Sequence, residues 1–406
     1  MLKNILILVS RNLFTNGFSI INSGEVIMID LTKEEKRKIA ESMVKTSMGI
    51  GKKTSGEYES VYIRYNPTDS SCKEFAECVE DECWKVGAYT LMREYSSARS
   101  KVKYELSSVE SIKQMDPLTK AIAETADVRM FIGEEDDPLW SESVADKVKL
   151  NAPNQQKLWE IMDNRCMRWI YFGWPIPGAA KGYGCPVPKF RKIFFNSIKM
   201  SFSQEMLELC KYYHSKLLCA DNVRIISDDT DLSFRVKGRP PIVDDGIISE
   251  NDKKNGDIGL NIPSGEVFIA PLETTAEGNV RFPVVVIPGF GRIDGLTLTF
   301  KAGKVVSFEA DEGKMRFEKF LASNTGDKDR IAELGIGCNP GAEFTGGSII
   351  IDEKVYRTIH IAIGNNTGSF HGVNKASSHL DMIKYMEKGK LVFDGNVVME
   401  GGLPVK

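Results

Sequence analysis

Three of the four histidines in this 406-residue sequence lie in one short stretch, residues 358–383, which reads TIHIAIGNNTGSFHGVNKASSHLDMI. Its first seven residues alternate as a β-strand does, so that the isoleucines face one way and His360 faces the other, among small residues. The fourth histidine, His214, lies on a predicted helix, and we interpret it as structural. The concentration of a scarce residue in one stretch favours a shared site over separate local roles.

The same stretch ends in the tripeptide His379-Leu380-Asp381. In an extended segment, His379 and Asp381 share a face while Leu380 enters the core. Two imidazoles and a carboxylate on adjacent extended segments are ligands suited to zinc, cobalt, manganese or iron. The alternative for each histidine alone is a local hydrogen bond. For the cluster as a whole, we predict a metal site.

Only aspartate or glutamate can complete this site, because the histidines are used up. Glu266 lies in NIPSGEVFIAP between apolar neighbours, where a solvated carboxylate is not expected. Glu333 lies in AELGIGCNP, where Gly335 and Gly337 share its face if the segment is extended, and such small residues leave space for an ion. The alternative is that each glutamate lies at a strand edge in water. Three carboxylates and two imidazoles suit two ions that share a bridging carboxylate about 3.5–4 Å apart.

The length of the chain exceeds one ordinary core and predicts two domains. Over residues 1–219, strands alternate with helices, which predicts an α/β domain with an open parallel sheet and flanking helices. Over residues 220–406, closely spaced strands with glycine turns predict a strand-rich α+β domain that carries the active site. Hairpin turns are expected at Ala302-Gly303 and Asp394-Gly395. Residues 313–334 are predicted to be a helical interruption.

Helical patterning first becomes convincing just after Met28, where Thr32 and Glu35 have the spacing of a capping box. The segment before it has an apolar run of five residues, too short for a signal peptide, and no small-residue cleavage site follows. We expect residues 1–27 to be a mis-assigned extension, with translation starting at Met28. The alternative is an additional N-terminal strand.

Composition argues against several partners and compartments. The formal net charge of −3 gives no reason to expect nucleic acid or an anionic membrane as a partner. No apolar run approaches the roughly 20 residues of a membrane span. The eight cysteines form no CxxC pair and lie mostly in apolar-periodic segments, as reduced cysteines of a cytoplasmic protein do.

Four segments resemble the metal-site motifs of the leucyl aminopeptidase / aminopeptidase T and S metallopeptidases, in the same order and at similar spacings. They are NIPSGEVFIAP, RIAELGIGCNP, the block from Glu353-Lys354 to TIHIAIG, and NKASSHLDMI. The resemblance is strong over residues 222–384 and only architectural before them. It implies five metal ligands, namely Glu266, Glu333, His360, His379 and Asp381.

The resemblance also implies an activity. Members of this family are cytosolic, dimeric exopeptidases with two divalent metal ions, for which we expect zinc, cobalt or manganese. We therefore expect a homodimer that removes apolar, leucine-like residues from peptides with a free N-terminus, through a water activated by both ions. One of the carboxylates is expected to be the general base, with Glu266 and Glu333 as the catalytic candidates.

The chain departs from this family at two positions. Thr367 stands where a tyrosine is often found, seven residues after the first ligand histidine, and Arg357 stands where a glycine is common. The strong donor left in this loop, besides Asn and Thr, is His371. We predict that His371 takes the role of the tyrosine and donates to the tetrahedral intermediate. The alternative is that the metals and backbone amides suffice.

Two other functions remain open from the sequence. Ring-opening dihydroxypyridine dioxygenases look similar in fold but use one iron on two histidines and one carboxylate, which His360, His379 and Asp381 would supply. A metal-stabilised binding protein without catalysis is the third possibility, which the missing tyrosine favours. The presence of both Glu266 and Glu333 favours the two-metal peptidase over the dioxygenase.

Overall fold

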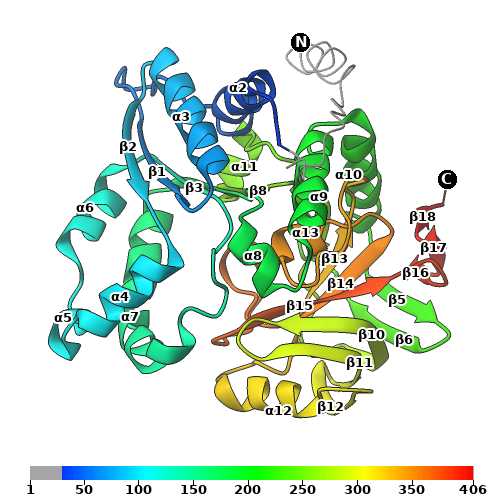
Figure 1. Cartoon of the computed structure of the whole chain (residues 1–406). Coiled ribbons are helices and arrows are strands. Elements are labelled where there is room, and N and C mark those ends of the chain that lie inside the picture. Colours follow the sequence, from blue (N-terminus) through cyan, green and yellow to red (C-terminus); the bar gives the residue numbers. More distant parts are fainter. Residues whose placement is uncertain (1–29, 406) are drawn as a thin grey trace, which may run out of the picture. The chain divides into compact units, whose positions relative to one another are not determined.

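The computed structural model describes residues 30–405, which form two compact units (Figure 1). Of these residues, unit 1 holds Asn196–Asp245 and residues 263–405, and unit 2 holds residues 30–195 and Gly246–Ile262. The sequence led us to expect one boundary near residue 220. The chain instead passes from one unit to the other at three places, after residues 195, 245 and 262. The predicted extension, residues 1–27, and the predicted start at Met28 lie outside the described residues.

Unit 2 is built on a parallel sheet with the strand order β2-β1-β3-β4-β8, as predicted for an α/β domain. Its strands are β1 (Ser60–Tyr65), β2 (Tyr89–Glu94), β3 (Val128–Ile132), β4 (Arg168–Phe172) and β8 (Gly259–Ile262). The sequence had assigned the segment of β8 to the strand-rich domain. It belongs to unit 2 because its backbone pairs in parallel with β4.

Helices flank this sheet and connect its strands. They are α2 (Lys33–Ser42), continued by the π-helix η1 (Met43–Ser47), α3 (Ser70–Lys85), α4 (Ser97–Leu106), α5 (Val109–Lys113), α6 (Pro117–Thr125), η2 (Glu142–Val144), α7 (Ala145–Asn164), α8 (Pro177–Gly182), α11 (Glu250–Asn255) and α9 (Val187–Met200), whose residues from Asn196 onward fall in unit 1. The predicted capping box is confirmed, because Thr32 and Glu35 satisfy each other's backbone amides at the start of α2. No helix in the described part of the chain is long and apolar enough to cross a membrane.

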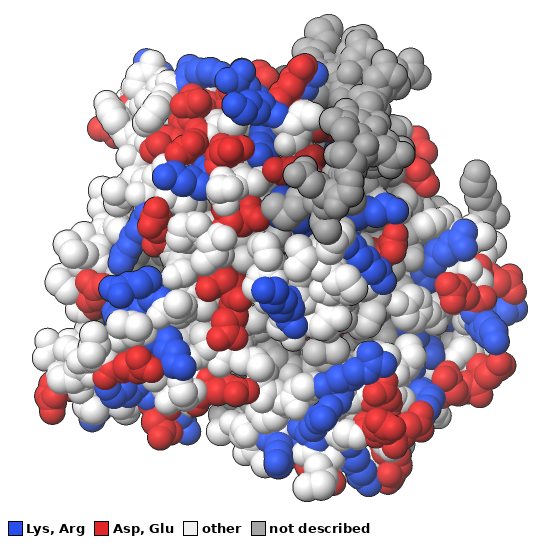
Figure 2. Space-filling model, viewed as in Figure 1, with Lys and Arg blue, Asp and Glu red and all other residues white. Residues whose placement is uncertain are grey.

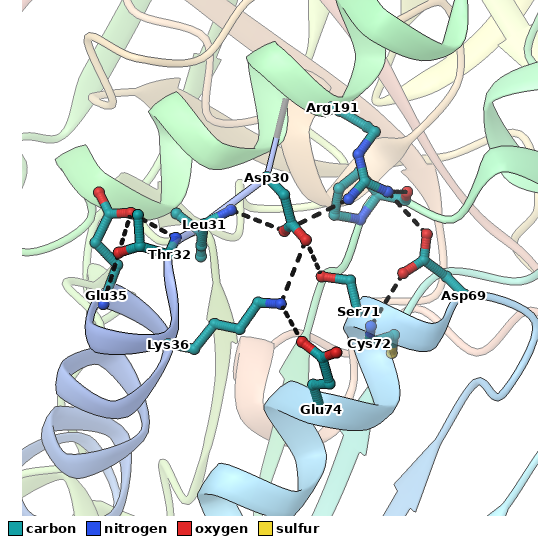
Figure 3. Close-up of polar contacts among 11 residues, drawn as sticks. Asp30, Leu31, Thr32, Glu35, Lys36, Asp69, Ser71, Cys72, Glu74 and Arg191 are labelled. Carbon is teal, nitrogen blue, oxygen red and sulfur yellow. Dashed lines mark hydrogen bonds and ion pairs between the residues drawn. The ribbon is translucent and has the colours of Figure 1, made fainter. Parts of the chain in front are cut away.

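A network of ion pairs holds the start of α2 against α3 and α9 (Figure 3). Arg191 of α9 pairs with Asp69 at 2.8 Å, and Asp69 also caps α3. Asp30 accepts hydrogen bonds from Lys36 and Ser71. Arg191 and Lys36 are both buried, and a buried charge is tolerated when it is paired in this way.

Unit 1 contains two antiparallel sheets. The larger one has the strand order β12-β11-β10-β6-β5-β16-β17-β18, with β5 (Asn222–Ser227), β6 (Thr230–Arg235), β10 (Glu277–Ile287), β11 (Gly291–Lys301), β12 (Lys304–Glu309), β16 (Lys390–Phe393), β17 (Asn396–Glu400) and β18 (Leu403–Pro404). The smaller one has the order β15-β14-β13-β9-β7, with β7 (Ile242–Asp244), β9 (Glu266–Ile269), β13 (Ile331–Gly337), β14 (Thr358–Gly364) and β15 (His379–Tyr385).

The remaining elements of this unit are α10 (Gln204–Leu217), α12 (Lys314–Ser323), α13 (Ile349–Asp352) and the 3-10 turn η3 (Gly368–Phe370). Both sheets, with α10 and α12, share one hydrophobic core, and the three isoleucines of β14 are fully buried in it, as predicted. Both predicted hairpin turns are confirmed. Ala302 and Gly303, like Asp394 and Gly395, have the positive φ angles that a two-residue turn needs.

The helical prediction for residues 313–334 is wrong in its second half. Residues 314–323 form α12, but Ile331–Gly337 form β13, in the middle of the smaller sheet. Every residue of β13 is buried, and a register shift interrupts the strand between Ile331 and Glu333. Because of this shift, Ile331 and Leu334 both face the core although they are three positions apart, a spacing that is also typical of a helix.

The surface shows no concentration of one charge on the face drawn in Figure 2, where basic and acidic side chains are interspersed. This agrees with the near balance of 53 basic and 56 acidic residues in the sequence. Such a surface offers no extended electrostatic platform on that face.

Candidate metal centre

The five predicted ligands come together on one face of the smaller sheet in unit 1, whose strands β13, β14 and β15 are labelled in Figure 1. Glu333 on β13 and Asp381 on β15 both pair with Ala362 of β14, so the two carboxylates flank this small residue. His379 pairs with Gly364 on the same face, two residues from Asp381, as the sequence predicted. Pairing between adjacent strands thus brings together ligands that are far apart in the sequence.

A β-bulge in β13 sets the direction of Glu333. Ile331 pairs with Ile363 in the core, whereas Glu333 pairs with Ala362 on the site face, and the register shifts between them. In a regular strand, residues 331 and 333 would share a face. The bulge at Ala332 therefore turns the carboxylate out of the core, which is a common use of bulges beside active sites.

Glu333 lies between the two histidines. Its Oε1 is 3.2 Å from Nε2 of His360, and its Oε2 is 3.2 Å from Nε2 of His379. The same Nε2 of His379 is 3.2 Å from Oδ1 of Asp381. One ligand atom each from Glu333, His360 and Asp381 lie within 4.8 Å of one another, a spacing that one cation can bridge.

Glu266 completes the set from β9. Its Oε2 is 3.8 Å from Nε2 of His360. Glu266, Glu333 and His360 are buried, while His379 and Asp381 are partly exposed. The partly exposed pair opens the site to solvent on one side, and the buried set closes it on the other.

Gly335 makes room for the first histidine. It pairs with His360 across the strands, and a Cβ atom at this position would lie 1.9 Å from Nε2 of the imidazole. The sequence suggested that the small residues beside Glu333 leave space for an ion. The space at Gly335 is filled by the ring of His360 instead, and the same ring contacts the carboxylate of Glu333.

The second histidine is oriented by the loop before it. Nδ1 of His379 lies 2.6 Å from the backbone oxygen of Asn365, which fixes a proton on Nδ1 and leaves Nε2 free to accept. The ring of Phe370 lies 4.9 Å from the imidazole and 5.6 Å from the ring of Phe268. A carbonyl and two aromatic rings thus hold a histidine in the state that binds a metal.

Lys354 is a central residue of the site that the sequence did not single out. Its side chain is fully buried, and Nζ lies 2.6 Å from Glu353, 2.7 Å from Glu266 and 3.2 Å from Asp244. Burial alone would lower the pKa of this ammonium group, but the three carboxylates hold it well above its usual value. Nothing in periodicity marks a lysine as the cation of a buried carboxylate cluster, and its place after Glu353 in the shared motif block was the available signal.

The charges of the site shift its pKa values strongly. Burial would lower the pKa of His360, but the hydrogen bond and charge of Glu333, with Asp381 and Glu266, raise it to about 9. The pKa of His379 is also raised, against the effect of burial, by Asp381 and Glu333. Burial would raise the pKa of Asp381, yet the charge and hydrogen bond of His379 lower it to about 2.

These donors fit a bound cation by their own geometry. Oε2 of Glu266, which lies 3.8 Å from Nε2 of His360, is buried and makes no hydrogen bond within the described residues, although buried polar atoms are normally satisfied. Imidazole nitrogens and carboxylate oxygens are the donor set of zinc, cobalt and manganese sites. Without a cation, protons on the histidines offset the negative charge of the carboxylates.

His371 lies in the loop between the two ligand histidines. Its side chain is exposed, its φ angle is 59°, and its backbone oxygen accepts a hydrogen bond from Arg239. Arg239 in turn pairs with Glu273 at 2.7 Å, which ties the loop to the body of the unit. Among the described residues, the imidazole of His371 contacts none of the ligands by a hydrogen bond, and its predicted role as a donor stays a prediction.

The amino-acid sequence also matches a known protein family. The sequence profile of the thermophilic metalloprotease (M29) family matches residues 32–399. The chain belongs to this family. Its metalloprotease character agrees with the cluster of carboxylates and imidazoles described above.

Individual proteins are similar to this chain in sequence or in structure. Aminopeptidase 2 from Geobacillus stearothermophilus is 37% identical over 76 residues, which are 19% of this chain and 18% of that protein. The solved structure of wild-type AmpT from Thermus thermophilus has a TM-score of 0.72 at 18% identity and covers 92% of this chain and 100% of its own. The 2,5-dihydroxypyridine dioxygenase from Pseudomonas putida KT2440 has a TM-score of 0.59 at 14% identity and covers 93% and 98%. The two structures show the likeness of fold.

Proposed function

We propose that this member of the M29 family is an aminopeptidase that removes apolar, leucine-like residues from peptides with a free N-terminus. The observation that carries the proposal is the convergence of Glu333, His360 and Asp381 on one site, with His379 and Glu266 beside them. The partial match to a protein named aminopeptidase 2 supports the choice of an exopeptidase.

The two oxygens of Glu333 support a site for two ions. Oε1 faces His360 and Oε2 faces His379, which is the arrangement of a carboxylate that bridges two cations. His360 and Glu266 would complete one position, and His379 and Asp381 would complete the other. We propose zinc, cobalt or manganese as the ions, because each accepts this mixture of nitrogen and oxygen ligands.

When bound, divalent cations supply a water that ionises near neutral pH and a positive charge that polarises the scissile carbonyl. The carboxylates of the chain would carry out the proton transfer. Burial raises the pKa of Glu266 and of Glu353, and we propose that one carboxylate of the site is the general base. Lys354 contacts both groups and keeps them close together. We propose Glu333 as the bridge and His371 as a donor to the oxyanion.

The direct test compares a free and a blocked substrate. Protein loaded with cobalt, manganese or zinc should hydrolyse leucine 4-nitroanilide but not its N-acetylated form, because the proposed site requires a free amine. Glu333→Gln should lower kcat/KM by at least about 10²-fold, as expected when a group that holds the reaction centre is lost. Glu387→Gln, an exposed glutamate after β15, serves as the control. Equal cleavage of both substrates would exclude an aminopeptidase.

A ring-cleaving dioxygenase is the second candidate. His360, His379 and Asp381 would supply the facial triad of a single iron, and the fold is similar to that of a dihydroxypyridine dioxygenase. Glu333 argues for the peptidase, because its two oxygens contact both histidines and are not needed in such a triad. Oxygen consumption with 2,5-dihydroxypyridine by the iron-loaded protein would favour this candidate. Metal binding without either activity would leave a non-catalytic binding protein.

We also propose that the protein is a cytoplasmic homodimer that binds neither nucleic acid nor membranes. The family resemblance supports the dimer, and the balanced charge supports the absence of these partners. Light scattering should give twice the chain mass of 45.3 kDa. A particle of the single-chain mass at micromolar concentration would contradict the dimer.

A further inference from the structure

One face of the parallel sheet in unit 2 carries arginines and aromatic rings in place of an aliphatic core. Arg64 on β1, Phe131 on β3 and Tyr171 on β4 are neighbours across three strands. Two positions earlier along the strands, Arg129 and Trp169 are neighbours on the same face. All five side chains are only partly buried, whereas the opposite face of the same strands is mainly apolar and buried.

These residues line a cavity of about 320 Å³ that belongs to this unit alone. Trp159 of α7 and Tyr95, just after β2, contribute further walls. The hydrophobic cluster on this side of the sheet is small, and it packs α6 and α7 against the early part of the strands. The aromatic and basic part beyond it is therefore open to a ligand, and its size suits a small molecule.

The two arginines in this cavity contact aromatic rings. The guanidinium of Arg64 lies 4.3 Å from the ring of Tyr95 and 5.5 Å from that of Phe131, and Arg129 lies 5.1 Å from the ring of Trp159. No carboxylate of the described residues forms an ion pair with either arginine. Glu135, also in the wall, instead accepts hydrogen bonds from the hydroxyl groups of Tyr95 and Ser97, at 2.8 Å in each case.

Other buried arginines of the same unit are paired. Arg168, on the opposite face of β4, pairs with Glu59, and Arg191 pairs with Asp69. Burial, and to a smaller extent the charge of Arg64, lower the pKa of Arg129 to about 10. The carboxylate of Glu135 offsets part of the charge of Arg64, whereas Arg129 forms no ion pair among the described residues. A guanidinium group beside flat rings attracts an anion more strongly than it would in water.

The position of the cavity in the parallel sheet also supports a ligand-binding role. The order β2-β1-β3-β4-β8 reverses direction between β1 and β3, and open sheets of this kind bind ligands beyond the carboxyl ends of the strands at such a point. Arg64, Phe131 and Tyr171 are each the second-last residue of their strand, whereas Arg129 and Trp169 are the second residues of β3 and β4, so the cavity extends from this end over the face of the sheet. Phe131 and Tyr171 stack on each other with their ring centroids 5.1 Å apart. We propose that this cavity binds a small anion that carries a planar aromatic ring, with the ring beside this stacked pair and the anionic group on Arg64 and Arg129.

Two probes distinguish the sources of such an anion. Adenosine 5′-monophosphate represents a nucleotide, and N-acetyl-L-tryptophan represents an aromatic carboxylate that the proposed aminopeptidase cannot use as a substrate. Calorimetry with the full, metal-loaded chain should show binding of at least one of them below millimolar concentration. Its uncharged counterpart, adenosine or N-acetyl-L-tryptophanamide, should bind at least about tenfold more weakly, because the charge-assisted hydrogen bonds to arginine are lost.

Variants then locate the binding. Arg64→Gln and Arg129→Gln should each weaken it at least about tenfold, whereas Arg37→Gln, an exposed arginine on α2 of the same unit, should leave it unchanged. Thermal unfolding verifies that each variant is folded, and Phe131→Leu replaces any arginine variant that is not. Binding should persist in Glu333→Gln, which separates this site from the proposed metal centre. Absence of binding by both probes, or equal affinity in the folded cavity variants, would overturn the proposal.

Discussion

At the scale of single residues, the site depends on positions where a side chain is missing as much as on the ligands. Gly335→Ala would place a methyl group 1.9 Å from the imidazole of His360, so the ring or the strand must move. We expect a loss of about 1–3 kcal/mol of stability from overpacking and a metal affinity at least about tenfold lower, since His360 would leave its place beside Glu333. Metal content after dialysis and denaturant unfolding measure the two effects.

Gly51→Ala is the control for this variant, because no atom lies within 4 Å of a Cβ at that position. The control should keep the metal content of the unmodified protein, since Gly51 lies in unit 2 and the predicted ligands lie in unit 1. Retention of both metal and stability by Gly335→Ala would contradict the close approach of the His360 ring to Gly335.

The raised pKa of His360 predicts how the metal-free protein responds to pH. Its value of about 9 exceeds the ordinary 6.5, so the charged imidazole stabilises the folded state. That stability is complete below pH 6.5 and is lost as the pH rises through 9, by on the order of 3 kcal/mol. Urea unfolding of the metal-free protein at pH 6 and pH 9 measures it.

Metal loading should remove this dependence, because the ligand form of histidine is neutral and binding releases its proton. The loaded protein is therefore the control, and proton release on metal addition at a pH of about 7.5 is a second readout. A metal-free protein that is equally stable at both pH values would contradict the ion pairs of His360 with Glu333 and Glu266.

At the scale of elements, the sequence predicted β14 and β15 well because strict alternation there separates isoleucines from ligands. The same reasoning placed His379 and Asp381 on one face, and the pairing agrees. It assigned the first half of β13 to a helix and did not anticipate the bulge at Ala332, because the bulge places the core residues Ile331 and Leu334 three positions apart, a spacing that also fits a helix. The role of Lys354 was not predicted from the sequence for another reason: tertiary packing brings its three carboxylate partners together.

The loop between β14 and β15 carries a prediction of its own. If His371 donates to the oxyanion, His371→Ala should lower kcat by about 10²–10³-fold while both metals stay bound and KM changes little. Steady-state kinetics with metal analysis separates these effects. Full activity of the variant would discard the role, and loss of metal would instead identify His371 as a ligand. His214→Ala, on α10 and outside the predicted ligand set, is the matched control.

At the scale of the whole molecule, the two units are not contiguous in sequence. Helix α10 lies before residue 220 but packs against β7 and β9 of unit 1, and β8 lies after residue 220 but pairs with β4 of unit 2. A boundary placed where the local pattern of strands and helices changes assumes that each unit is one continuous segment. The fold class was predictable because it follows from the order of elements, whereas these exchanges depend on long-range pairing.

The central proposal is that one chain holds two divalent ions, with Glu333 as a ligand of both; Glu333 contacts both histidines. Elemental analysis of the purified protein, with concentration from amino-acid analysis, tests it most directly. We predict two zinc, cobalt or manganese ions per chain, and at most one in His379→Ala or Asp381→Ala. A single iron per chain that is unaffected by Glu333→Gln, in a protein that consumes oxygen with 2,5-dihydroxypyridine, would contradict it.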